Sequence, residues 1–195
     1  MTAPAHSVPL LATDPGFLLW APLGSTIPTD TVTGSVFTDA WDVAWVPLGS
    51  TDAGHNFNWQ TSTSPIEVAE YLDPLQYKTT GRAGSISFAL ANFIASNWKR
   101  MLNGGTLTAS GTGATSLAQY SPPATGAEVR SMIGWESEDH TERLVIFQCF
   151  NTGQVTVTRQ KGAAKAVLPV EFSIEQPAAG GAPFRYSAAG AARAA

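Results

Sequence analysis

A run of acidic residues with one histidine is the strongest candidate for chemistry in this sequence. It comprises Glu136, Glu138, Asp139, His140 and Glu142. Such a cluster could hold a hard metal ion, and Glu136 and Glu138, at alternating strand positions, could serve as the acid and base of a glycoside hydrolase. Because solvent-exposed turns are built from the same residue types, we favour a hairpin turn over a catalytic site here.

Other patterns of catalytic residues are missing from the sequence. The residues around Ser85 do not fit the G-x-S-x-G motif of a nucleophile elbow. The glycine-rich stretch at 104–127 has no Lys or Arg to bind a phosphate. Cys149 is the single cysteine, so neither a disulfide framework nor a thiolate metal site is expected, and the side chain is predicted to be buried. These observations predict a protein without enzymatic activity or a cofactor.

Four tryptophans offer a binding function as the alternative. The side chains of Trp41, Trp45, Trp59 and Trp135 could stack on sugar rings, which would make the protein a carbohydrate-binding β-sandwich module. Indole rings also fill cores and protein interfaces, and that use is more common.

The elements that would position these side chains are mostly strands. A stretch with apolar side chains on both faces, 143–150, predicts a central strand. Apolar and polar residues alternate in four other stretches, at 85–91, 129–135, 154–159 and 168–175. Pro169 cannot donate to a ladder, so we expect the last of these strands to run at an edge or to contain a bulge.

The fold class expected from this pattern is mainly β. We predict two packed antiparallel sheets in a sandwich or barrel-like arrangement, with one flanking α-helix at about 92–103. Asn92 could cap that helix, and Asn103 with Gly104 would end it.

Length and composition fit one domain with extended ends. A chain of 195 residues can bury a core without disulfides. We expect the domain at 16–176, an N-terminal arm at 1–15 and a C-terminal arm at 177–195. The Gly/Ser/Thr-rich stretch at 104–127 is expected to be a flexible insert without regular structure. The apolar runs are too short to span a membrane, and the first residues lack signal-peptide features, so we expect synthesis in a reducing cytoplasm.

Charge is divided unevenly along the chain. Residues 1–77 contain acids but no Lys or Arg, whereas 143–170 contains only bases. The net charge of −4 argues against a nucleic-acid-binding domain. Either the charges compensate within one fold, or the acidic part of one copy meets the basic part of the next. In the second case, added salt should weaken assembly.

Three parts of the chain carry a family resemblance. They are PGF at 15–17 with APLGSTIPTD at 21–30 and AWVPLG at 44–49, then GSISFAL at 84–90 with NWKRMLNG at 97–104, and finally the strands at 144–150 and 165–175. Together they resemble the major tail tube proteins of long-tailed (siphovirus-type) phages that infect actinobacteria. The resemblance implies a tail-tube fold and a structural protein of the virion tail. Its subunits would form hexameric rings that stack into the tube through which genomic DNA passes.

The resemblance also implies partners and contact regions. Rings would be joined by the two arms and by an extended stretch near 51–80. Besides copies of itself, the protein would meet the tape measure protein in the lumen, the tail terminator and distal tail proteins, and, weakly, the DNA in transit, with assembly in the host cytoplasm. We predict the following residues at contacts between subunits: Asp30, Asp39, Asp42, Arg159, Lys161, Lys165, Phe184 and Tyr186.

Overall fold

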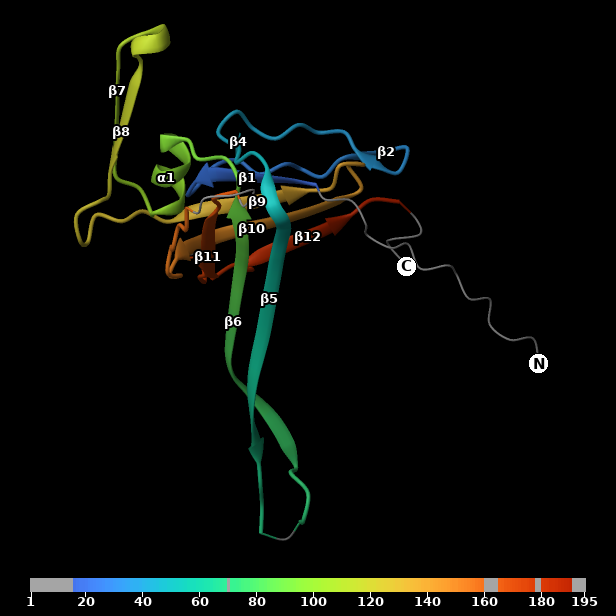
Figure 1. Ribbon diagram of the computed structural model, residues 1–195. Coiled ribbons are helices and arrows are strands. Elements are labelled where there is room, and N and C mark those ends of the chain that lie inside the picture. The colour runs from blue at the N-terminus through green and yellow to red at the C-terminus, as the bar shows by residue number, and fades with distance from the viewer. Residues whose placement is uncertain (1–15, 70, 160–164, 178–179, 191–195) are drawn as a thin grey trace.

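The chain forms a body of crossed strands with two hairpins that project from it in opposite directions (Figure 1). The computed structural model describes residues 16–69, 71–159, 165–177 and 180–190. The long hairpin consists of β5 (Thr51–Ile66) and β6 (Gln76–Leu90), and the short one of β7 (Thr106–Ser110) and β8 (Leu117–Ser121). The expected N-terminal arm at 1–15 lies outside the described residues. The fold is mainly β with packed antiparallel sheets, as predicted.

One eight-stranded antiparallel sheet makes up the body and the long hairpin. Its order is β4-β1-β9-β10-β11-β6-β5, and β12 also pairs with β10. The bounds not yet given are β1 (Phe17–Pro22), β4 (Val46–Pro47), β9 (Ser131–Glu136), β10 (Glu142–Asn151), β11 (Leu168–Ile174) and β12 (Phe184–Ala188). A further pair, β2 (Val32–Thr33) and β3 (Val36–Phe37), forms a small separate sheet, as do β7 and β8.

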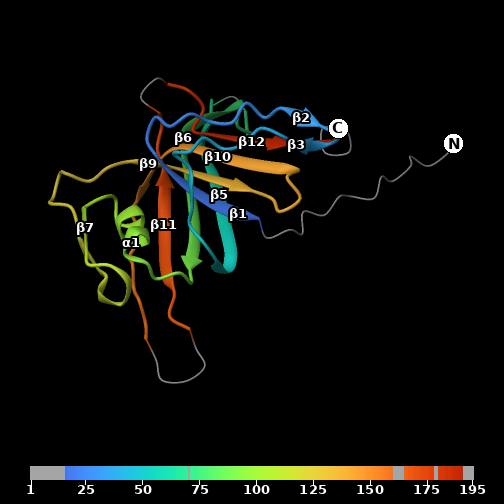
Figure 2. The same cartoon turned by 90° about the horizontal axis from the view of Figure 1, so that it is seen from above.

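Strand β10 turns the corner that folds this sheet over its own core. One side of β10 pairs with β9, with an irregularity in register between Ile146 and Cys149. Its other side pairs first with β12 and then, from Cys149 on, with β11. As a result, β11, β6 and β5 run across the strands β1, β9 and β10 (Figure 2). Bulged strands that change sheets form such corners in crossed packings.

The core lies between the two crossed halves of the sheet. Ile86 and Leu90 on β6 and Phe172 on β11 are fully buried against Ile133 on β9 and Ile146 on β10. The alternating apolar residues of the sequence therefore point inward, as the strand pattern predicted. Burial of each such side chain contributes about 1.5–3 kcal/mol, which makes this cluster the main stabilising element.

The predicted strand at 154–159 is wrong, although its pattern reports a real feature. This segment has no regular secondary structure, yet Val155 and Val157 pack against the core. The alternation of apolar and polar residues therefore reflects burial of one side of an extended segment. No strand of the described chain forms backbone hydrogen bonds with it in a β-ladder. The expectation that the strand with Pro169 runs at an edge or contains a bulge is wrong, because β11 lies between β10 and β6 and its pairing with both is regular. Pro169 is tolerated because it pairs with Ala89 of β6 at a position that the β10 ladder, which covers Phe172–Ile174, does not reach.

The flanking helix is present but shorter than predicted. Helix α1 spans Ala95–Met101, and Ile94 rather than Asn92 occupies its N-cap position. Its buried Asn97 fixes the helix to the body, because the side-chain amide donates to the carbonyl of Leu48 at 3.0 Å. Asn103 ends the helical segment with a positive φ of 57°. No helix among the described residues is long and apolar enough to cross a membrane.

Two stretches expected to lack fixed structure are part of the fold. The insert at 104–127 contains the β7–β8 hairpin, in which Leu107 pairs with Tyr120 and a 3₁₀ turn (Gly113–Thr115) joins the strands. Small polar residues supply little hydrophobic alternation, which is why the pattern failed to reveal these strands. The C-terminal arm at 177–195 is also corrected, because β12 within it pairs along β10 as a strand of the sheet.

The corner in β10 predicts an unreactive cysteine. Cys149 is fully buried there, and burial raises the pKa of its thiol to about 12. Since the thiolate is the reactive form, a disulfide reagent at pH 8 should not modify the native protein over a time in which it fully modifies the protein in denaturant. The Cys149→Ser variant, which has no thiol, gives the background signal of the reagent. Rapid modification of the native protein would contradict the burial of Cys149 at the corner in β10.

Candidate functional site

A buried cluster of charges lies where β9, β10 and the loop before β4 meet. At its centre, the Arg143 side chain is only 2% exposed. Its Nη1 lies 3.1 Å from a carboxylate oxygen of Asp39 and 3.4 Å from one of Asp30. Its Nε lies 3.1 Å from Glu136, the residue directly opposite it on β9. Three chain segments therefore share one cation.

Aromatic rings and a backbone oxygen complete the surroundings of this guanidinium. Its Cζ lies 4.7 Å from the ring centroid of Phe37 and 5.6 Å from that of Trp41. Its Nη2 donates to the backbone carbonyl of Asp39 at 2.6 Å. An arginine with its hydrogen-bond donors paired and its planar face covered in this way is held in one orientation.

The cluster also holds the C-terminal strand. Arg185 on β12 contacts Asp30 at 2.9 Å and donates to the carbonyl of Pro28 at 2.7 Å. The hydroxyl of Ser187 donates to the same Asp30 at 2.5 Å. The acids of the sequence's acidic half thus meet bases of its C-terminal part inside one chain. Of the two interpretations of the divided charge, compensation within one fold holds for Asp30 and Asp39.

Glu136, one of the two carboxylates considered for catalysis, belongs to this charge cluster. Both oxygens of Glu136 are bound by Arg143, and they also contact His140 Nδ1, at 2.5 Å, and Trp41 Nε1. Glu138 lies beyond the end of β9 in an exposed turn. The structure thus gives Glu136 and Glu138 different environments. The predicted turn at 138–141 is confirmed, but the favoured interpretation of the whole cluster as a solvent-exposed turn is wrong for Glu136 and Glu142, which are buried on β9 and β10.

The remaining predicted contact residues are scattered over the molecule. Asp42 is exposed and caps its own loop by accepting from the backbone N–H of Ala44 at 3.0 Å. Lys165 pairs with Asp52 of its own chain at 2.6 Å, and Arg159 stacks on the Phe93 ring. Lys161 lies outside the described residues. Their roles between subunits stay predictions.

The two C-terminal aromatic residues differ in exposure. Phe184 packs edge-to-face against Phe57 and Trp59 of β5, with ring centroids 5.0 Å apart in each case. The C-terminal strand therefore uses this ring inside its own chain. Tyr186 remains 55% exposed and is available at the surface.

The tryptophans considered as sugar platforms are used in packing. Trp41 and Trp45 contact each other edge-to-face, and Trp45 and Trp135 are buried. Trp59 is half-buried and covers Gly84, where an added Cβ would lie 2.4 Å from the indole. Trp45 and Trp135 are therefore too buried to stack on a sugar, whereas Trp41 and Trp59 remain partly exposed.

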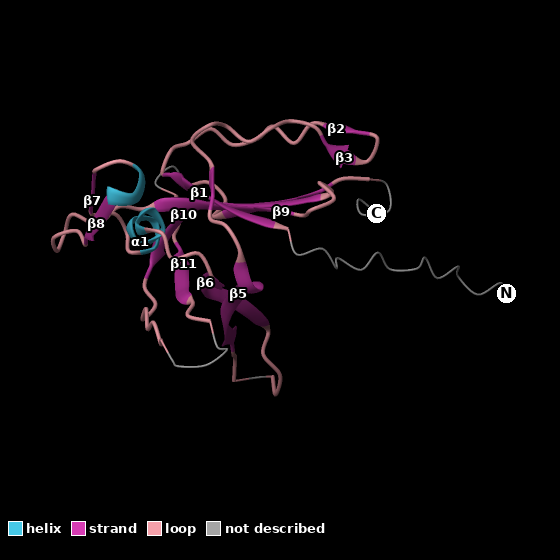
Figure 3. Cartoon of the chain, turned by 45° about the horizontal axis from the view of Figure 1, so that its top comes forward, coloured by secondary structure: helices cyan, strands magenta, loops and turns pink. Residues whose placement is uncertain are grey.

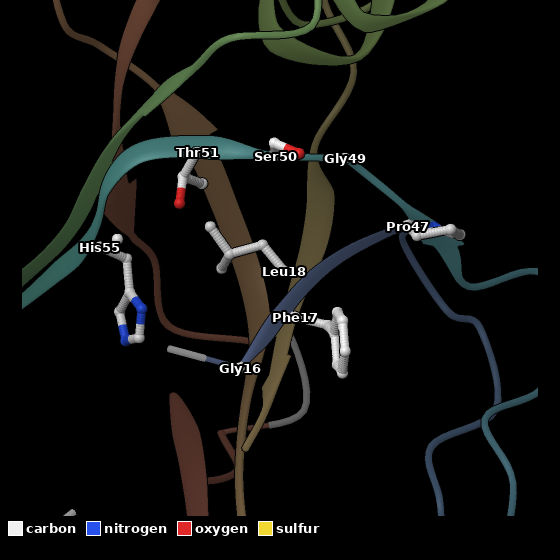
Figure 4. Close-up of a pocket in the computed structure, with 9 residues that line it drawn as sticks. Gly16, Phe17, Leu18, Pro47, Gly49, Ser50, Thr51 and His55 are labelled. Atoms are coloured by element: carbon white, nitrogen blue, oxygen red, sulfur yellow. The ribbon is translucent and has the colours of Figure 1, made fainter. Parts of the chain in front are cut away.

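The hollow in Figure 4 also lacks a catalytic arrangement. It has a volume of about 360 Å³ and lies between the start of β1 and the start of β5. Among the described residues that line it, His55 is the one with an ionisable side chain; burial lowers the pKa of this imidazole, and the ring points away from Ser50. No group of three or more metal-ligating side chains occurs in the described part of the chain.

The outer part of the β5–β6 hairpin has a concentration of large apolar side chains exposed to solvent. Residues 61–81, which we call the hairpin tip, extend beyond the body (Figure 1), and nearly all of those described are exposed. Large apolar side chains concentrate there, with exposed fractions of 43% for Ile66, 106% for Leu72 and 60% for Leu75. Tyr71 and Tyr77 are exposed as well. Apolar patches of this kind mark interaction surfaces.

Comparison with protein-family models gives no match, and no curated protein matches the sequence.

The charge cluster predicts a large effect of removing its cation. Arg143→Met would leave the buried carboxylates without their counter-charge, which typically costs about 3–5 kcal/mol of the free energy of unfolding. Arg130→Met, which breaks the exposed pair with Glu175, is the matched control and should leave the urea midpoint close to that of the wild type. Urea denaturation followed by tryptophan fluorescence measures both. Equal midpoints for the two variants would contradict the structural role of the cluster.

Acid should weaken the same cluster. Burial alone would raise the pKa of the Asp39 carboxyl, but the backbone N–H groups of Asp30 and Asp39 and the Arg143 charge lower it below the ordinary value of 3.8. A carboxyl whose pKa is lower in the folded than in the unfolded protein stabilises the fold above its unfolded pKa, and this contribution is lost as the pH falls through the folded pKa. The free energy of unfolding should therefore decrease below pH 3.8, and less steeply in Asp39→Asn. Parallel pH curves for the two proteins would rule out this contribution.

Proposed function

We propose that the protein is a structural subunit of a virion, which assembles as rings that stack into a phage tail tube. The observation that carries this proposal is the long β5–β6 hairpin, whose tip has apolar side chains and no partner element in the described chain. A two-stranded hairpin is at best marginally stable alone in water. Copies of the same subunit would supply the missing contacts.

The open edges of the sheet support the same function. The sheet ends at β5 on one side, and this strand of 16 residues has β6 as its single strand neighbour in the described chain. A long free edge offers unpaired backbone groups to another chain. Closing such edges between identical subunits in a head-to-tail manner generates rings, and ring-on-ring contacts generate tubes.

The chemical groups also suit a structural role without catalysis. The best carboxylate candidate, Glu136, is bound to Arg143 and His140, and the tryptophans considered for sugar binding are packed. Six-fold rings, the tape measure protein, the terminator and distal tail proteins and the passing DNA follow from the family resemblance, and so does location in the virion tail. They form part of this proposal.

Self-assembly of the purified full-length chain tests the proposed function. We expect rings or tubes by negative-stain microscopy and large species in sedimentation at high protein concentration. A variant in which Asn-Gly replaces 62–81, joining the paired residues Thr61 and Arg82, should stay small because it lacks the hairpin tip. Its control replaces 111–116 by Asn-Gly between the paired residues Ser110 and Leu117, and this variant should still assemble.

A wild-type chain that remains monomeric at every concentration and salt level would contradict the proposed function. Titration with glycans would then test the carbohydrate-binding alternative.

A further inference from the structure

We propose that the hairpin tip of one copy docks beside α1 of a second copy, in an apolar groove that lies next to the unpaired Arg100 of that helix. The proposal rests on the proposed function, because it names the surface through which successive rings would stack. Four features of the described chain carry it: the groove, the cations, the composition of the tip and their positions in the fold.

The groove lies between the end of β1 and the start of β9. It has a volume of about 410 Å³ and is lined by Trp20, Pro22, Leu23, Val129 and Arg130. Leu23 and Val129 are 49% and 50% exposed, so apolar surface at this place faces solvent. The indole N–H of Trp20 is buried without a hydrogen-bond acceptor in the described chain. An unsatisfied donor of this kind costs free energy until an acceptor reaches it.

One cation without a counter-charge, Arg100, lies beside this groove, and Lys99 precedes it on α1. The guanidinium of Arg100 lies 5.9 Å from the Trp20 ring centroid, and burial lowers its pKa. Its hydrogen bonds go to Ser96 and Asn97, and neither it nor the exposed Lys99 forms an ion pair with any described residue. Arg130, by contrast, is already paired with Glu175. Arg100 and Lys99 therefore attract an acidic partner.

The hairpin tip has the complementary composition. Between Ile66 and Tyr77 it contains acids and apolar residues and no Lys or Arg. Glu67 and Asp73 are exposed, and neither forms an ion pair with a described residue. Leu72 between them is fully exposed. An acidic segment with protruding leucine fits an apolar groove with a basic border, because opposite potentials orient the contact and apolar burial stabilises it.

The positions of the two surfaces favour contact between copies. Figures 1 and 3 show the hairpin tip on one side of the body, with α1 and the β7–β8 hairpin on the other. A tip that cannot fold back to its own α1 can reach the α1 of the next copy along the hairpin direction. Such a contact uses two different surfaces of the same molecule, so it repeats from copy to copy and produces a stack.

This inference changes which bases are expected to meet the acidic half of a neighbour. From the sequence, the expected bases are those at 143–165, within the stretch 143–170 that has no acids. Arg143 is buried in its own cluster and Lys165 is paired with Asp52. The unpaired cations of α1 are therefore proposed as partners of the tip in place of Arg143 and Lys165, while the roles of Arg159 and Lys161 stay predictions.

A charge exchange between two variants tests the contact. Glu67→Lys with Asp73→Lys makes the tip basic, and Arg100→Glu with Lys99→Glu makes the border of the groove acidic. Each variant alone places like charges together, so we expect the protein concentration needed for stacking to rise about tenfold or more, with single rings still visible. In an equimolar mixture, a stack in which the two variants alternate joins opposite charges at every contact, so stacking should return toward the wild-type concentration.

Controls separate this contact from folding and from the proposed function. Thermal unfolding should give similar midpoints for the tip variant and the wild type, since Glu67 and Asp73 are exposed and have no ion-pair partner in the described chain. The α1 variant loses the Arg100 hydrogen bonds to Ser96 and Asn97, so a lower midpoint is expected for it and its stacking is measured well below that midpoint. Glu171→Lys, an exposed acid on β11, should leave stacking unchanged. If the wild type stacks and the variants stack equally well, or if the mixture fails to recover, the contact is wrong while the proposed function stands. If the wild type never assembles, the proposed function itself fails.

Discussion

The buried guanidinium of Arg143 is the interaction on which the arrangement of the rest depends. It attracts carboxylates from the loop before β4 and from β9, and Asp30 in turn binds Arg185 on the C-terminal strand. An isolated charge could not be buried there, because the free energy of removing it from water far exceeds the stabilisation gained by packing one side chain. The acids and bases must therefore meet as a set, and when they do, the segment between β1 and β4 and the strand β12 are held against β9 and β10.

The remaining strands, β11, β6 and β5, cross over β9 and β10 on the other side of the core. Beyond Cys149, β10 pairs with β11, and β6 and β5 continue this half of the sheet across the core. The core covers only the inner ends of these two long strands, where Ile86 and Phe88 are buried. Their outer ends continue past the body with no layer beneath them in the described chain. In β5 and β6 the inner ends are packed and the outer ends expose apolar side chains, which contacts with identical copies could bury.

Sequence patterns predicted the parts of this fold that depend on apolar alternation. The strands around Phe88, Ile133 and Phe172 and the turn after Glu136 follow directly from the order of residue types. The charge cluster was missed, because Asp30 and Arg143 are far apart in sequence and each is an ordinary surface residue by composition. The β7–β8 hairpin was missed because it is held mainly by backbone pairing between small residues. Asp39 and Asp42 look alike in sequence, and only the tertiary fold makes one a member of the cluster and leaves the other exposed.

The central claim is that copies of this chain complete the hairpin tip, and hydrogen exchange at its backbone amides tests this most directly. Amides of 61–81 should exchange rapidly in dilute protein, because strands without a covering layer open easily. In concentrated, assembled protein the same amides should become strongly protected, while those of β9 and β10 are protected in both states. Rapid exchange of the tip in assembled particles, or protection already complete in the dilute single chain, would contradict the account.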